Sequence, residues 1–360
     1  MEGIKKNFKN SHILIIGSGI IGKFSALELS KQGFKITIVD PQKSKNGSSA
    51  ALGLLMGNMY QKSKGRSWEL RKKSNELWPK WIKFLQKYNK TLNIDKPLIQ
   101  LTTKQDNFEK LSKFIAHHPK RDLKVLERDS TIIQNINKIF KIDNLSGIIS
   151  NQDGRIDPIS LLKTLNIFLK DEKINFINEE IVKIRKLKNQ WISTCSNKLE
   201  IASDVVVLCN SLDAIKLIDL NCHNIKLKPV LGQAMEISIH EKGINLLSLP
   251  KHFNINGKNF LRTNKNKLII GSTDEYDIRP KENTFEELTD FLENKPQWLN
   301  KNNITNKWFG IRSRPEGEPS PILKSLEKGL ILCTGFYKNG ILLAPACSNW
   351  ISTEIENHLL

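Results

Sequence analysis

The fold is decided near the start of the chain by the segment His12-Ile13-Leu14-Ile15-Ile16-Gly17-Ser18-Gly19-Ile20-Ile21-Gly22. Its apolar run predicts a buried parallel strand, and three glycines follow with the spacing G-x-G-x-x-G before helix-like sequence over 23–32. Gly17 permits a tight turn, Gly19 lets the backbone approach a pyrophosphate, and Gly22 lets the helix pack closely on the strand. The N-terminus of that helix offers free N–H groups and a positive dipole to phosphate oxygens.

An acidic residue stands where a dinucleotide site requires one. The second apolar run, over 35–39, ends in Asp40, about twenty residues beyond the glycines, where a carboxylate accepts hydrogen bonds from an adenosine ribose. A glycine-rich turn that binds nothing is the alternative, and it does not account for strand, turn, helix and acid together. The sequence therefore predicts a dinucleotide site, without distinguishing NAD, NADP and FAD.

The composition is that of a globular protein with an excess of positive charge. The chain has 360 residues, of which 39% are hydrophobic and 26% charged, and its formal net charge is +19. That length predicts two domains. The lysines are scattered, and the sequence has no arginine-rich block, no RNA-binding aromatic signature and no zinc-finger spacing. We therefore expect no nucleic-acid partner and a solvated basic surface that attracts anionic substrates.

Cysteine usage indicates a reducing compartment. The five cysteines, at positions 195, 209, 222, 333 and 347, are an odd number and have no C-x-x-C spacing. Cys209 and Cys333 lie in apolar runs, where buried thiols are expected. The adjacent His117 and His118 lack further ligands, so no metal site is predicted. The sequence shows neither a signal-peptide pattern nor about eighteen consecutive apolar residues, which predicts a cytoplasmic protein with no membrane span.

Strand-like and helix-like runs predict an α/β fold with two domains. A buried Val/Leu run over 204–208 indicates that the parallel sheet resumes after an insertion. In contrast, β-type sequence over 226–239 and 259–273 indicates a separate antiparallel-sheet domain. The Rossmann-like dinucleotide-binding domain is assigned to 1–80, 145–225 and 315–360, and the substrate domain to 81–144 and 226–314. Helices are expected over 66–88, 107–118, 159–169 and 285–294, and at the end of the chain.

Three separated segments point to one site: the first glycine turn, a small-residue loop at 48–55 and a second glycine turn at 335–345. This arrangement resembles the FAD-dependent oxidoreductases of the D-amino-acid oxidase superfamily, and within them the glycine oxidase branch linked to thiamine biosynthesis. The most specific match is G-F-Y-K-N-G-I-L-L-A-P over 335–345, similar to G-H-[YF]-R-N-G-I-L-L-A-P of that branch. Weaker matches are S-S-A-A-L-G-L-L at 48–55, G-R-I-D-P at 154–158, P-V-L-G-Q at 229–233 and I-I-G-S-T at 269–273.

The resemblance implies FAD as the cofactor and assigns residues to it. Backbone groups of Ile20 and Ile21 are expected at the pyrophosphate, Asp40 at the adenosine ribose and Val182 at the adenine edge. The helix N-terminus after the second glycine turn is expected to stabilise negative charge on the flavin ring. Residues expected along the ribityl–flavin path are Ser48, Ser49, Gly53, Leu54 and Leu55, and those at the isoalloxazine ring are Phe336, Tyr337, Lys338, Asn339, Gly340, Ile341 and Leu342. The hydroxyls at 48–49 are equally well explained as the cap of a short helix.

Arg312 matches the substrate-binding arginine of the branch and is the predicted catalytic residue. Its guanidinium is expected to hold an amino-acid carboxylate in a two-point contact and so place the α-carbon at the flavin. A surface arginine is one alternative, and Arg314, which precedes a proline as the family arginine does, is the other. Several positions depart from the branch. Asp40-Pro41 replaces Glu followed by Arg or Lys, Phe336 and Lys338 replace His and Arg, and Asn259, followed by Phe260, falls on the active-site tyrosine.

The expected activity is FAD-dependent oxidative deamination of a small amino acid or amine, namely glycine, sarcosine or a D-amino acid. Hydride transfer to the flavin is expected, with molecular oxygen as acceptor and peroxide as product, and the branch implies a link to thiamine thiazole synthesis. Two alternatives stay open. One is a flavin dehydrogenase that passes electrons to a quinone or a protein, and the other is a flavin-binding protein that has lost turnover. A homo-oligomer is compatible with the sequence.

Overall fold

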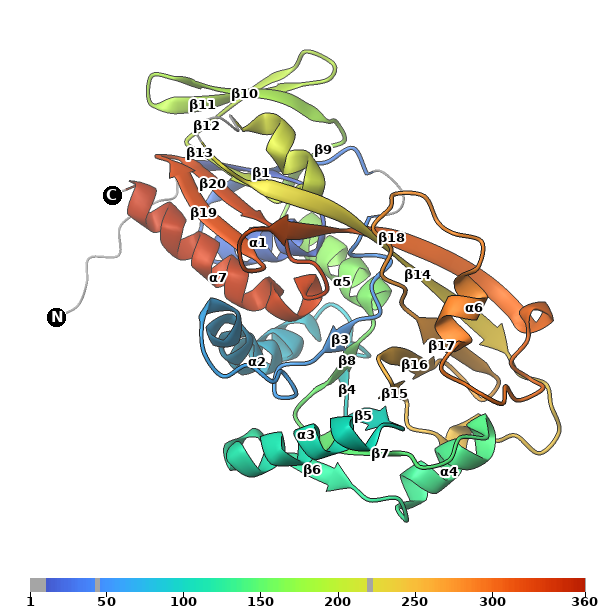
Figure 1. The fold of residues 1–360 in the computed structure, drawn as a ribbon. Coiled ribbons are helices and arrows are strands. Elements are labelled where there is room, and N and C mark those ends of the chain that lie inside the picture. Colours follow the sequence, from blue (N-terminus) through green and yellow to red (C-terminus); the bar gives the residue numbers. More distant parts are fainter. Residues whose placement is uncertain (1–10, 43–45, 219–222, 360) are drawn as a thin grey trace.

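A mostly parallel sheet is one of the two large sheets in the computed structural model, which describes residues 11–42, 46–218 and 223–359. Its strand order is β19-β20-β13-β1-β2-β9 (Figure 1). β1 pairs in parallel with both β2 and β13, and only the edge strand β19 runs antiparallel to its neighbour among the strands described. The bounds are β1 His12–Ile16, β2 Lys35–Val39, β9 Asn175–Ile177, β13 Val205–Leu208, β19 Ile322–Glu327 and β20 Leu330–Thr334.

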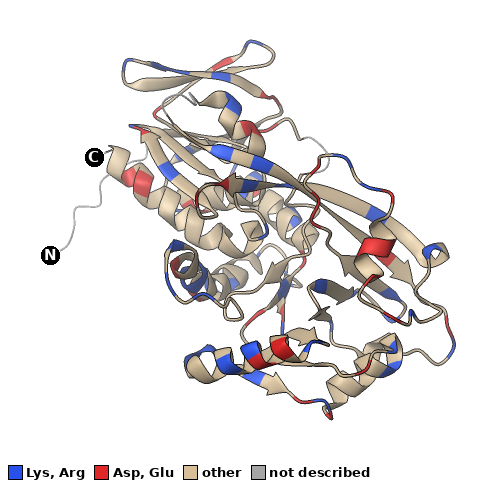
Figure 2. Ribbon diagram, viewed as in Figure 1, with Lys and Arg blue, Asp and Glu red and all other residues tan. Residues whose placement is uncertain are grey.

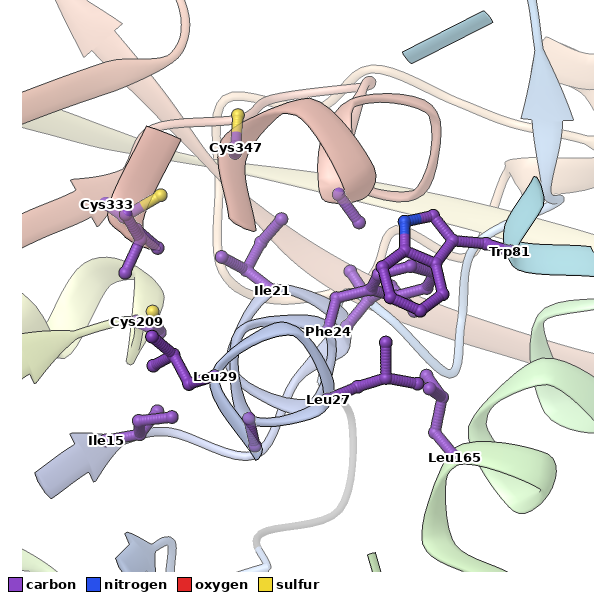
Figure 3. Packing of buried hydrophobic residues seen from close by; sticks show 14 of the residues in the cluster. Ile15, Ile21, Phe24, Leu27, Leu29, Trp81, Leu165, Cys209, Cys333 and Cys347 are labelled. Carbon is purple, nitrogen blue, oxygen red and sulfur yellow. The ribbon is translucent and has the colours of Figure 1, made fainter. Parts of the chain in front are cut away.

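Helix α1 is the centre of the core beside this sheet. It is buried on nearly every side, between the sheet and helices α2, α5 and α7. Its apolar residues are accordingly not confined to one stripe. Figure 3 shows Phe24 and Leu27 directed toward Trp81 of α2 and Leu165 of α5. The rings of Phe24 and Trp78 meet edge to face at 5.4 Å. The bounds are α1 Ile20–Ser30, α2 Arg66–Leu85, α5 Pro158–Asp171 and α7 Gly340–Leu359.

Thiols fill the other side of this core. Cys209, Cys333 and Cys347 are all buried and unpaired by disulfides, as is Cys195, and Figure 3 shows the first three near α1. The prediction that Cys209 and Cys333 are buried is therefore confirmed, whereas Cys222 lies outside the described residues. Burial and the two neighbouring thiols raise the pKa of Cys333 well above its usual value. The Cys333 thiol is consequently a protonated packing group.

A second, mainly antiparallel sheet has the strand order β18-β14-β17-β16-β15-β5-β7-β6. Its longest strands, β14 and β18, contain 13 residues each and pair along almost their whole length. An aromatic core lies beneath it, in which Phe253 and Phe260 stack at 5.2 Å and Phe140 meets Trp298 at 5.3 Å. The bounds are β5 Leu98–Thr102, β6 Leu123–Leu126, β7 Ser146–Ser150, β14 Lys226–Ser238, β15 His252–Ile255, β16 Lys258–Arg262, β17 Lys267–Gly271 and β18 Ile304–Glu316.

The predicted α/β class, with a Rossmann-like parallel sheet and an antiparallel sheet, is confirmed. The domain limits stay a prediction, and those at residues 80 and 314 fall inside α2 and β18. Helix α6 is shorter than predicted. The remaining elements are α3 Gln105–His117, α4 Thr131–Phe140, α6 Thr284–Thr289, β3 Leu54–Leu55, β4 Ile94–Asp95, β8 Gly154–Ile156, β10 Ile181–Leu187, β11 Gln190–Cys195, β12 Glu200–Ser203, η1 Pro119–Arg121, η2 Ser211–Leu217, η3 Leu246–Ser248 and η4 Lys301–Asn303.

Candidate active site

The first glycine turn has a backbone that only glycine tolerates. Gly17 has φ +103°, and a Cβ placed there would meet the backbone of Cys209 and Asn210 at 2.8 Å. A Cβ on Gly22 would lie 1.9 Å from the carbonyl oxygen of Gly17, so α1 can approach the turn only with glycine at that position. The N–H of Gly17 donates to the carbonyl of Val39 at 2.9 Å, which fixes the turn against β2.

The N-terminus of α1 presents backbone groups. Ile20 and Ile21 are 3% and 6% exposed, and their side chains pack into the core. A ligand at this turn would therefore contact their backbone N–H groups. Gly19 caps the helix without a side-chain hydrogen bond. The Ile20 N–H donates to Ser48 Oγ at 2.9 Å. Residues 47–50 form a turn, so the short helix considered as the alternative for Ser48 and Ser49 is wrong.

A cavity of about 200 Å³ opens beside this turn. It brings together three predicted cofactor residues from separate elements, namely Gly17, Asp40 and Val182. The Asp40 carboxylate accepts from the Ser18 N–H at 2.6 Å and so lies against the glycine turn. Asn210 also lines the cavity, and its Oδ1 is buried without a partner among the described residues. The sequence interpretation missed Asn210, although its place after the buried strand β13 is the signal expected at the carboxyl edge of a parallel sheet.

The small-residue loop is held against the Gly154–Pro158 motif. Gly53 has φ +83°, and a Cβ there would lie 1.9 Å from the Ile156 carbonyl oxygen. Leu54 and Leu55 form β3, which pairs antiparallel with β8. Further along, buried Asp153 accepts from the N–H groups of residues 57, 58 and 59 at 2.8–3.0 Å. Burial raises the pKa of Asp153, and those hydrogen bonds oppose the rise.

The second glycine turn lies beside the first. A Cβ on Gly340 would lie 3.7 Å from the Ile20 side chain, so the N-termini of α7 and α1 are neighbours. Phe336, Ile341 and Leu342 are at most 9% exposed. Buried Arg71 of α2, which the sequence interpretation missed, donates to Asn339 Oδ1 at 2.9 Å. The two turns predicted to hold one cofactor therefore meet, although they lie at opposite ends of the sequence.

Arg312 on β18 projects toward the second turn. Its Nη1 donates to the Thr273 carbonyl at 3.1 Å and to Asp274 Oδ1 at 2.9 Å, and its Nη2 donates to Ser272 Oγ at 2.6 Å. The Arg312 side chain is 15% exposed. Burial lowers the pKa of Arg312 from its usual value, and Asp274 is the main opposing influence. Arg312 is therefore a partly desolvated cation and not a surface residue.

Tyr337 and Lys338 of the second turn complete this cluster. The Tyr337 hydroxyl donates to Asp274 Oδ1 at 3.2 Å, and Lys338 forms an ion pair with the same carboxylate. Burial and the nearby Asp274 raise the pKa of Tyr337 to about 12, so its phenol stays protonated. The guanidinium of Arg314 lies over the rings of Tyr276 and Tyr337. Asp274 and Tyr276 were not predicted, because Asp274 pairs with Arg312 and Tyr276 with Arg314, each across a long sequence separation.

Asn259 stands where the glycine oxidase branch has its active-site tyrosine, so this position has no phenol hydroxyl. Its Oδ1 accepts from Asn254 at 2.9 Å on the neighbouring strand. Phe260 points to the opposite face and is fully buried in the aromatic core. The hydroxyl near the arginine pair comes instead from Tyr337, with Tyr276 at the exposed side.

The residues of both turns fit FAD. The fold and the site together define a flavin-dependent oxidoreductase, with a glycine turn and an acid for the adenosine half and a second helix N-terminus beside a buried cation. The chain matches the family described as "FAD dependent oxidoreductase" (DAO) over residues 12–353 and belongs to that family. It is an FAD-dependent oxidoreductase, and FAD is the predicted cofactor confirmed by this membership.

Relatives agree with this family. Glycine oxidase from Bacillus cereus is 21% identical, with a TM-score of 0.80 over 97% of this chain and 95% of that one. Iminodiacetate oxidase from Chelativorans is 17% identical, with a TM-score of 0.81 over 96% and 95%. The bifunctional protein ThiO/ThiG of Synechocystis is 24% identical over 96% of this chain and 51% of that protein. The chain thus spans about half the length of the curated relatives it matches.

Within the described residues, no helix is long and apolar enough to cross a membrane. The same residues contain no group of three or more His, Cys, Asp or Glu side chains placed to hold a metal ion.

Proposed function

We propose that the chain oxidises a small amino acid or amine, with glycine and sarcosine as the first candidates. The observation that carries the proposal is the position of Arg312, a desolvated cation whose cluster includes Tyr337 and Lys338 of the predicted flavin turn. A carboxylate bound there lies next to that turn. The likeness to glycine oxidase supports the same class of substrate.

Each side chain has a defined task in this mechanism. Arg312 is expected to hold the substrate carboxylate, because a guanidinium offers a fixed fork of donors and the hydrogen bonds to residues 272–274 use only Nη1 and one N–H of Nη2. The Thr273 carbonyl and Ser272 hydroxyl hold that guanidinium in one orientation. The Tyr337 hydroxyl stays protonated and therefore remains a donor rather than a base. A substrate whose amine enters in its neutral form has its nitrogen lone pair available, so no strong base is required.

The redox chemistry belongs to the cofactor. When bound, FAD accepts the hydrogen and electron pair of the substrate α-C–H bond, while the protein supplies orientation and electrostatics. The α-carbon and nitrogen then form an imine and the nitrogen proton goes to water. Hydrolysis of the imine gives a carbonyl compound together with ammonia from glycine or methylamine from sarcosine. The N-terminus of α7 favours negative charge next to it. Molecular oxygen as acceptor, with peroxide released, completes the proposed cycle.

The experiment is an anaerobic screen of the FAD-loaded protein. Glycine, sarcosine, D-amino acids and proline are added, and the visible flavin absorbance is followed. We expect glycine or sarcosine to bleach it, and oxygen consumption with peroxide release to follow on aeration. Bleaching without oxygen consumption would favour the dehydrogenase with a quinone or protein acceptor. Absence of bleaching by every compound would overturn the proposed oxidation and favour a flavin-binding protein without turnover.

A role in thiamine thiazole synthesis is the narrower form of this proposal. Its support is the likeness to the bifunctional ThiO/ThiG proteins, which is confined to about half of their length. Glycine as the best substrate in the screen is the expected result, because glycine oxidases are among the solved structures that the chain resembles. A preference for proline or for large D-amino acids would contradict it.

A further inference from the structure

An internal carboxylate occupies the arginine to which a substrate carboxylate is expected to bind. Asp274 follows directly after the I-I-G-S-T motif, and its Oδ1 accepts from Arg312 Nη1 at 2.9 Å. Its Oδ2 forms the ion pair with Lys338. Asp274 thus lies between Arg312 of β18 and Lys338 of the predicted flavin turn. An anionic substrate group bound between these two cations would gain the most electrostatic stabilisation.

The charges around this point leave positive charge uncompensated, because Arg314, which lies over the ring of Tyr337, adds a third cation to Arg312 and Lys338. Arg312 and Lys338 share Asp274, whereas the adjacent Glu275 faces away and pairs with Gln233 Nε2 at 2.9 Å. Glu275 is 2% exposed and also accepts from the backbone of Lys281. A substrate carboxylate would offset the positive charge that Asp274 leaves uncompensated on Arg312 and Lys338. A second substrate carboxylate would meet Asp274 as a like charge in a partly desolvated place.

Arg312 keeps its position without help from Asp274. Its guanidinium has two neutral partners, Ser272 Oγ at 2.6 Å and the Thr273 carbonyl at 3.1 Å. It lies over Gly232, where a Cβ would be 2.0 Å from Nη2. Asp274 itself is 36% exposed and stands at the start of a connection that contains the exposed Tyr276. The carboxylate can therefore leave the guanidinium while the guanidinium stays in place.

We propose that Asp274 is a specificity-determining residue of the proposed substrate site. Its carboxylate competes with the substrate carboxylate for Arg312 and Lys338, which weakens anion binding and restricts the site to substrates with one carboxylate or none. The inference rests on the proposed function because it takes Arg312 as the substrate-binding cation. Asp274 thereby excludes dicarboxylates from the proposed substrate site.

The test compares anion binding by the FAD-loaded wild type and Asp274→Asn. Acetate and malonate are the probes, and dissociation constants come from calorimetry and from the flavin absorbance. We expect Asp274→Asn to bind acetate about tenfold more tightly, because one like charge is removed next to the guanidinium. Malonate should gain more than acetate, since its second carboxylate can then meet Lys338. Unchanged or weaker binding of both probes in Asp274→Asn would overturn the proposal.

Three further variants make the result specific. Asp274→Glu keeps the charge and should bind acetate as the wild type does. Asp277→Asn removes a charge from the same connection, where Asp277 accepts from the backbone N–H groups of residues 278 and 279, and should also leave acetate binding unchanged. In the Asp274→Asn background, Arg312→Ala should abolish the gain. Equal tightening in Asp277→Asn, or a gain that survives Arg312→Ala, would overturn the proposal.

Failure of the inference can be told from failure of the proposed function. If glycine bleaches the wild-type flavin but Asp274→Asn binds acetate unchanged, the inference is wrong and the function stands. If no amino acid bleaches the flavin but Asp274→Asn gains acetate affinity through Arg312, the oxidation is wrong and the competition between carboxylates stands.

Discussion

At the scale of single residues, Gly232 controls the position of Arg312 without touching substrate. We expect Gly232→Ala to weaken acetate binding about tenfold, because the new methyl group would lie 2.0 Å from Arg312 Nη2 and must displace the guanidinium. Calorimetric titration measures this. Gly257→Ala is the control, because a Cβ there has no neighbour within 4 Å. The positive φ of Gly257 makes this change costly for folding stability, but it should leave acetate affinity unchanged. Equal acetate affinity in Gly232→Ala and wild type would contradict the account.

His252 gives a prediction about pH. It is 1% exposed in β15, and burial together with Arg155 lowers its pKa to about 4. The unfolded chain therefore binds a proton near pH 6.5 that the folded chain does not. The free energy of unfolding is therefore unaffected by protonation of this residue above pH 6.5. It decreases by about 3 kcal/mol as the pH is lowered from 6.5 toward 4. Urea unfolding between pH 4.5 and 7.5 should show a flatter pH dependence for His252→Leu than for wild type. Parallel curves would contradict this assignment.

The sequence predicts individual site residues unevenly. Gly17, Asp40 and Val182 come from motifs or resemblance, and the structure places all three around one cavity. Asp274 could not be predicted, because its importance comes from a salt bridge to Arg312 that depends on how β17 and β18 are placed by the sheet. The strand β17, which precedes Asp274, and the strand β18, which contains Arg312, are not neighbours in the sheet, because β14 lies between them.

At the scale of elements, α2 holds the second glycine turn through Arg71 and Trp78, whose Nε1 donates to the Leu342 carbonyl at 3.0 Å. Arg71 donates to the Met56 carbonyl at 3.0 Å and to Asn339 Oδ1 at 2.9 Å. We expect Arg71→Met to release FAD about tenfold more readily, because the turn at 335–342 loses a charge-assisted hydrogen bond. Flavin fluorescence after dilution measures the release. Lys72→Met on the exposed side of the same helix is the control, since its ion pair with Glu69 lies in solvent. Equal FAD release by Arg71→Met and the control would contradict this role.

Local signals predict helices better than they predict their ends. The prediction omits α4, although Ser130 caps it and its isoleucines have helical spacing. It extends α6 to residue 294, whereas the helix ends at Thr289. Helix ends depend on tertiary packing that a single sequence does not contain. In contrast, the glycine spacing at the start of α1 has a steric cause within its own strand and turn, and that element was predicted closely.

At the scale of the whole molecule, the excess of positive charge is spread over the fold. Figure 2 shows Lys and Arg on helices, strands and connections of both sheets. The distribution agrees with a solvated basic surface, and the absence of a nucleic-acid partner stays a prediction. The buried Val/Leu run over 204–208 indicates that the parallel sheet resumes after an insertion, but no local pattern shows that this strand pairs with β1.

The most direct test of the account is an anaerobic glycine titration of FAD-loaded wild type and Arg312→Ala, followed by the visible flavin absorbance. The account predicts that glycine bleaches the wild type, and that Arg312→Ala retains its flavin but requires about a hundredfold more glycine, because the charge-assisted contact to the carboxylate is lost. Identical titrations of the two proteins would contradict the central claim that Arg312 binds the substrate beside the flavin.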